Sequence, residues 1–128
     1  MSLKARENKL LVLTSDLYSA INSHLPHLEE SYCALKSSTN AALFDDLLRE
    51  ITHSTQAMEE IYCQRVDLSG GAVDVDVTNV YESYLEEINH LRQLVSNVKE
   101  QLEEDELSSI EQEIEQTKKK LAEQMSLF

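Results

Sequence analysis

The side chains best suited to chemistry in this sequence are two copies of a Glu-x-x-His motif. Glu50 precedes His53 by three residues, and Glu87 precedes His90 by the same spacing. On a helix this spacing places a carboxylate and an imidazole on one face, as in the ligand sets of carboxylate-bridged di-metal bundles. Such a centre also needs inward-pointing glutamates from two further helices. The chain offers Glu30 but no evident fourth helix, so a di-metal centre is a minor alternative to two solvated helix flanks.

Other metal-binding and catalytic patterns are incomplete. His24 and His27 have a spacing that fits one helix face, but neither Cys33 nor Cys63 belongs to a CxxC pair, which a structural zinc site normally shows. The acidic stretch from Asp74 resembles the start of an EF-hand loop, yet it lacks the glycine and the glutamate required at later positions. We therefore expect no catalytic residue, no enzymatic activity and no cofactor. We expect the two cysteines to be free thiols of the core type.

The composition favours an all-helical chain. Two glycines and one proline among 128 residues leave little scope for the tight turns of β folds or for glycine-rich phosphate-binding loops. A net charge of −13 would repel nucleic-acid backbones and anionic lipid surfaces. Neither a signal peptide nor an apolar run of about 18 residues is evident. These features predict an intracellular protein, cytoplasmic or nuclear, that binds neither nucleic acid nor membrane directly.

Apolar residues recur every three or four positions through the first half of the chain, which is typical of amphipathic helices. The first stripe crosses Pro26, where the helix should kink or a second helix should start. Either Asn40 or Thr39 can cap the helix that follows. We therefore expect residues 1–66 to form a helical hairpin, with its first helix kinked or split at Pro26.

A linker rich in Gly, Asp and Val, residues 67–79, should separate this hairpin from the rest of the chain. Its clearest break is Ser69-Gly70-Gly71. The strict alternation of valine and aspartate in residues 72–77 predicts an extended segment. Asn79 has a glutamate three residues later, as in a capping box, so the last helix should begin there.

Residues 80–128 carry the most regular pattern and predict a long amphipathic or coiled-coil helix. One heptad frame runs to Leu102, the phase slips near residues 103–107, and a second frame starts at Leu107. Two interpretations of the slip are open, a continuous helix and a helix–turn–helix break. We favour the continuous helix because no glycine or proline supports a turn. The seam residues are Tyr81, Tyr84, Ile88, Leu91, Val95, Val98, Leu102, Leu107, Ile110, Ile114 and Leu121.

This seam is the predicted interaction surface. Its first half has an alternative role, in which it packs on the chain's own hairpin. Its second half is too thinly apolar to be stable alone in water and should lie against another chain. The leading hypothesis is therefore a non-enzymatic helical subunit, a coiled-coil scaffold or adaptor in a larger assembly. It should bind protein partners through the C-terminal helix, as a homo- or hetero-oligomer.

The C-terminal pentapeptide allows a second functional hypothesis. It resembles the linear motif by which bacterial replication and repair proteins dock on the DNA sliding clamp, in which a glutamine leads and a Leu-Phe pair fills an apolar pocket. The matching residues are Gln124, Met125, Ser126, Leu127 and Phe128. The resemblance implies a clamp-binding adaptor, although Phe128 also fits the second heptad frame. In size, acidity and helical character, the whole chain is also similar to flagellar and type III secretion export chaperones, which cover hydrophobic helices of their clients.

Overall fold

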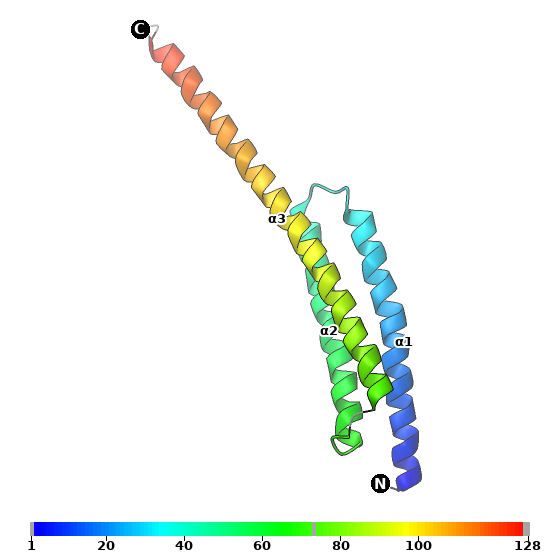
Figure 1. The fold of residues 1–128 in the computed structure, drawn as a ribbon. Helices are drawn as coiled ribbons and strands as arrows, with labels where there is room; N and C mark the ends of the chain where they lie inside the picture. Colours follow the sequence, from blue (N-terminus) through cyan, green and yellow to red (C-terminus); the bar gives the residue numbers. More distant parts are fainter. Residues whose placement is uncertain (1, 73, 127–128) are drawn as a thin grey trace.

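The computed structural model describes residues 2–72 and 74–126, and all regular structure in these ranges is helical. Helix α1 comprises Leu3–Leu35, α2 comprises Ala41–Leu68 and α3 comprises Val75–Ser126. Helices α1 and α2 form an antiparallel hairpin, and the first half of α3 returns along it (Figure 1). The second half of α3 projects beyond the hairpin as a single helix (Figure 1). The predicted fold, a helical hairpin followed by a long C-terminal helix, is confirmed.

Helix α1 continues through its proline. Ser2 caps its N-terminus, where the side-chain oxygen accepts a hydrogen bond from the amide of Ala5 at 3.2 Å. Pro26 lies inside the helix with its side chain exposed, so water can reach the carbonyl that loses its intrahelical donor. Because α1 is one element, the alternative with a second helix starting at Pro26 is wrong.

Both ends of α2 follow local rules read from the sequence. The Asn40 side chain caps the start, accepting a hydrogen bond from the amide of Ala42 at 3.1 Å. At the other end, Gly70 and Gly71 have φ angles of 73° and 86°, in the left-handed region that favours glycine. The amide of Gly71 donates to the carbonyl of Val66 at 3.0 Å and closes the last turn. The predicted break after α2 is confirmed.

The start of α3 differs from the prediction. The carboxylate of Asp74 accepts hydrogen bonds from the amides of Asp76 and Val77 at 2.9 and 3.1 Å, so the helix begins at Val75. The extended segment was therefore a wrong prediction for residues 75–77, and so was the helix start at Asn79; Val73 lies outside the described residues. The physical reason is burial, because the earlier start places Val77 in the core at 4% exposure.

The core of the bundle is built by all three helices. We use "bundle" for α1, α2 and residues 75–102 of α3. The buried core residues are Leu17, Ile21, Leu25, Leu28, Phe44, Leu47, Ile51, Met58, Val77, Tyr84, Ile88, Leu91 and Val95. Four of these, from Tyr84 to Val95, belong to the first half of the predicted seam. Tyr81, Val98 and Leu102 are partly buried against the same core. The alternative in which this half packs on the chain's own hairpin is therefore confirmed.

Candidate protein-interaction surface

Helix α3 leaves the bundle at a polar contact near Lys99. The Lys99 ammonium lies 2.6 Å from the carboxylate of Asp45 on α2 and 3.7 Å from that of Glu103 on its own helix. The hydrogen bond to Asp45 raises the pKa of Lys99 above its ordinary value, with smaller contributions from both carboxylate charges, while partial burial opposes the shift. Leu102 is the last residue of α3 that packs on the core. Beyond it, no described residue of α1 or α2 packs on the helix.

Residues 103–126, which we call the distal segment, remain helical and fully accessible. The helix passes through the phase slip without interruption, so the continuous-helix interpretation is confirmed and the helix–turn–helix break is wrong. Every residue of the distal segment is exposed. At 1.5 Å per residue the segment extends about 36 Å from the bundle. A free helix of this length is only marginally stable in water, since most helical stability in proteins comes from packing an apolar face.

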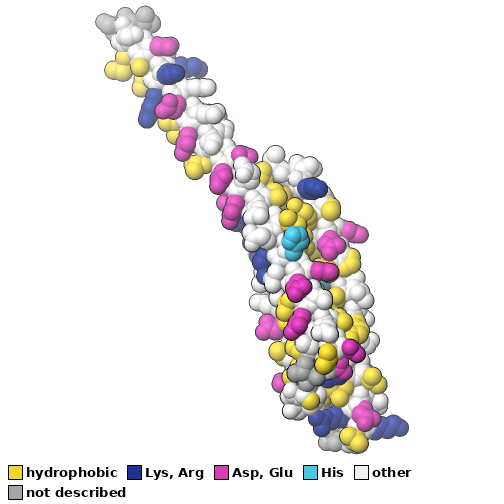
Figure 2. Space-filling model, in the orientation of Figure 1, with side chains coloured by type: hydrophobic (Ala, Val, Ile, Leu, Met, Phe, Trp, Pro, Cys, Tyr) yellow, Lys and Arg dark blue, Asp and Glu magenta, His cyan; other side chains and the backbone are white. Residues whose placement is uncertain are grey.

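The distal segment carries such an apolar face. Its members are Leu107 at 57% exposure, Ile110 at 46%, Ile114 at 49% and Leu121 at 56%, and we call them the distal seam. Figure 2 shows hydrophobic side chains along one edge of the projecting helix. Thr117 and Gln124 occupy two further positions of the same heptad frame, which makes the stripe thin. Exposed apolar residues aligned at heptad spacing are the pattern of a helix that pairs with another helix.

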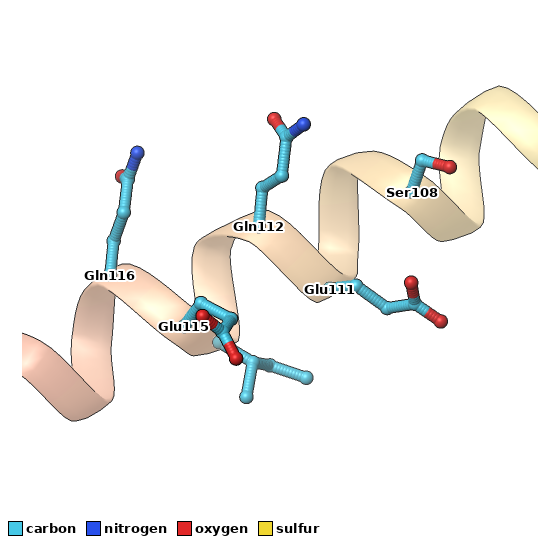
Figure 3. A pocket seen from close by; sticks show the side chains of 6 residues that line it. Ser108, Glu111, Gln112, Glu115 and Gln116 are labelled. Carbon is cyan, nitrogen blue, oxygen red and sulfur yellow. The ribbon is translucent and has the colours of Figure 1, made fainter.

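One flank of the distal segment, beside the distal seam, is hollowed and open. The hollow beside Ser108 is lined by residues of this one helix, the seam residue Ile114 among them. Figure 3 shows Glu111 and Glu115 pointing to one side of the helix and Gln112 and Gln116 to another. No second element encloses the hollow within the described residues, so it cannot bury a small ligand. The distal segment therefore offers a helix face for binding and no enclosed pocket.

The two Glu-x-x-His motifs do not meet. Glu50 and His53 line a surface hollow of about 420 Å³ between α1 and α2. Glu87 and His90 line a separate hollow of about 540 Å³ between α1 and α3. In the part of the chain that the structure describes, no group of three or more His, Cys, Asp or Glu side chains is close enough to hold a metal ion. The geometry therefore does not assemble the ligand set of a di-metal centre from these two motifs.

A buried polar contact that the sequence reading missed ties the three helices together. The Ser54 hydroxyl on α2 lies 2.7 Å from the Tyr84 hydroxyl on α3 and 3.1 Å from Nδ1 of His24 on α1. Ser54 and Tyr84 are 5% and 1% exposed, so the Tyr84 hydroxyl depends on Ser54 for hydrogen bonding, whereas Ser54 has His24 as a second partner. A signal for Ser54 existed in the sequence, because it stands three residues after Ile51 and four before Met58, within the apolar stripe.

The cysteines are the clearest error in the side-chain predictions. Cys33 and Cys63 are free thiols, as expected, but both are exposed. Each directly follows a tyrosine of an apolar stripe, which places it one position off the buried face. The prediction of core-type thiols is therefore wrong.

The structure describes only part of the proposed clamp-binding pentapeptide. Gln124, Met125 and Ser126 form the last turn of α3, and Met125 is 68% exposed. Leu127 and Phe128, which would fill the clamp pocket, lie outside the described residues. The first three residues of the motif are therefore helical and accessible.

Comparisons with protein families, with characterised proteins and with solved structures give no match to this chain. Within the described ranges, none of the helices has the length and apolarity needed to span a membrane. The fold and surface together define a class: a three-helix bundle whose last helix extends beyond the bundle and exposes an apolar seam.

Proposed function

We propose that this chain is a non-enzymatic helical subunit that binds a partner protein through the distal seam. The observation that supports this function is the contrast between the two halves of α3. Residues of the first heptad frame are covered by α1 and α2, whereas Leu107, Ile110, Ile114 and Leu121 of the second frame are covered by nothing in the described residues. A partner helix lying along the distal seam would bury these four side chains and stabilise the segment that carries them.

The charge distribution of the distal segment supports a helical partner. The distal segment has eight acidic and three basic residues around a narrow apolar stripe. Oppositely charged side chains flanking the seam of the partner helix would set its register and orientation. The binding mode is therefore helix against helix, with apolar residues at the centre and ion pairs at the rim.

Affinity capture with a seam variant tests this function. The variant Ile110→Glu/Ile114→Glu/Leu121→Glu places three carboxylates in the seam. The matched control, Gln112→Glu/Gln116→Glu/Ala122→Glu, adds the same charge on the opposite face of the same helix. We expect wild type and control to bind the same partner, whether another protein or a second copy, and the seam variant to lose it. Equal binding by all three proteins, or binding by none, would contradict the proposed function.

A further inference from the structure

The distal segment separates its charges along its length. Residues 103–115 contain seven acidic side chains and no basic one, whereas residues 118–120 are three consecutive lysines. All of these side chains are exposed, and the acidic and basic regions flank the same distal seam. The charge pattern of such a surface is complementary to the same pattern running in the opposite direction. It attracts a second copy of itself when the two copies run in opposite directions.

We infer that the partner of the distal seam is a second copy of this chain, paired antiparallel. This inference rests on the proposed function and names the partner. In the second heptad frame, Leu107, Ile114 and Leu121 share one seam position, and Ile110, Thr117 and Gln124 share the other. Antiparallel coiled coils place one kind of seam position opposite the other kind. In the register centred between residues 115 and 116, Ile110 faces Leu121 of the second copy, and Ile114 faces its Thr117.

The same register pairs the flanking charges. Glu111 and Lys118 lie on one flank of the seam, and Glu113 and Lys120 lie on the other. Antiparallel pairing sets Glu111 opposite Lys118 of the second copy and Glu113 opposite its Lys120. The twofold axis repeats both contacts, so the dimer gains four pairs of opposite charges.

A parallel pairing is less favourable on the same grounds. It would set Glu106 opposite Glu111 of the second copy on both sides of the seam, which offsets the attraction of Glu113 for Lys118 of the second copy, and it would place two acidic bundles side by side. In the antiparallel register residue 126 faces residue 105, so the described helix of one copy stays clear of the bundle of the other. The two bundles then lie at opposite ends of the paired segments.

Cysteine cross-linking tests the orientation directly. Two proteins carry Ile110→Cys or Leu121→Cys, each in a Cys33→Ser/Cys63→Ser background that removes the exposed native thiols. Antiparallel pairing predicts a disulfide-linked dimer from the equimolar mixture and none from either protein alone, because a disulfide requires Cα atoms within about 7 Å. Cross-linking of the Ile110→Cys protein with itself would indicate parallel pairing and overturn the inference.

Sedimentation and charge reversal complete the test. We expect wild type to sediment at twice the chain mass of 14.6 kDa. Lys118→Glu/Lys120→Glu should raise the dissociation constant at least tenfold, and adding Glu111→Lys/Glu113→Lys in the same chain should restore it. A monomer at all concentrations would overturn the second-copy inference, while seam-dependent capture of another protein would still support the proposed function. A dimer that persists in the triple seam variant would overturn both.

Discussion

The hydrogen bond between Ser54 and Tyr84 gives the sharpest test of how the bundle is held together. The two hydroxyls lie 2.7 Å apart, and both residues are nearly inaccessible to water. His24, the second partner of Ser54, is only partly buried and can exchange its contact for water. The two hydroxyls are therefore unequal. Removing Ser54 takes away the one hydrogen-bond partner that Tyr84 has among the described residues, whereas Ser54 keeps His24 when Tyr84 is changed.

This asymmetry sets the expected magnitudes. Tyr84→Phe removes one hydrogen bond and leaves no buried group unpaired, so it should lower the free energy of unfolding by about 1 kcal/mol. Ser54→Ala leaves the tyrosine hydroxyl buried without a partner and should cost about 1–3 kcal/mol. In the double variant the unpaired hydroxyl is gone. Its cost should therefore fall below the sum of the two single costs by about 1–2 kcal/mol.

Urea unfolding followed by far-ultraviolet circular dichroism measures these costs, with all proteins at one concentration because of the expected self-association. Ser83→Ala is the matched control, since Ser83 is an exposed hydroxyl residue beside Tyr84 on α3. Its effect should stay within about 0.5 kcal/mol and should add to that of Tyr84→Phe. Strict additivity of Ser54→Ala and Tyr84→Phe would refute the reasoning, because it would mean that the hydroxyl pair is not coupled in the core.

Three further predictions concern α1, the distal segment and pH. Pro26→Ala should raise the free energy of unfolding by about 1–3 kcal/mol in urea titrations, because alanine restores an intrahelical donor at an exposed position. A free energy of unfolding below that of wild type would contradict a regular helix at this position. Ending the chain after Glu104 should leave the thermal midpoint of the bundle within a few degrees of the wild-type value, because the described residues of the distal segment do not pack on the core. Loss of cooperative melting would contradict this prediction. Burial, followed by the nearby charge of Glu59, raises the pKa of Tyr81 above its ordinary value of 10.0. The fold therefore favours the neutral phenol, and the free energy of unfolding should fall as pH rises above 10.0. Tyr81→Phe keeps the ring stacked on Tyr62 and should make this fall shallower when urea midpoints are measured against pH. An unchanged slope would contradict the role of Tyr81.

Periodicity predicted the helices because each one buries a stripe that recurs every three to four residues. Capping and turn residues predicted a cap at Asn40 or Thr39, of which the structure uses Asn40, and a break at the glycines after α2, because both features depend on neighbours in the sequence. The start of α3 was missed because two candidate caps, Asp74 and Asn79, lie five residues apart and only tertiary burial of Val77 decides between them. Local sequence contains no information on that burial.

The candidate site, too, could be predicted from the sequence only in part. The spacing of Ile110, Ile114 and Leu121 was enough to predict an apolar face beyond the phase slip. Spacing could not tell whether the first half of the seam meets another chain or the hairpin, since either surface buries the same side chains. Nor could it bring Ser54 to Tyr84, which are 30 residues apart and meet only once α3 has packed on α2.

The phase slip points the distal seam in a different direction from the seam that packs on the hairpin. Leu107 follows Leu102 by five residues, where the first frame calls for three or four. At about 100° per residue, this step places Leu107 roughly 140° around the helix from Leu102. A longer hairpin would therefore leave Leu107 and Ile114 largely uncovered, because they lie about 140° and 120° around the helix from Leu102, the last residue that packs on α1 and α2. The slip thus separates two binding tasks on one helix: the residues before it complete the chain's own core, and the residues after it present a new face to a partner.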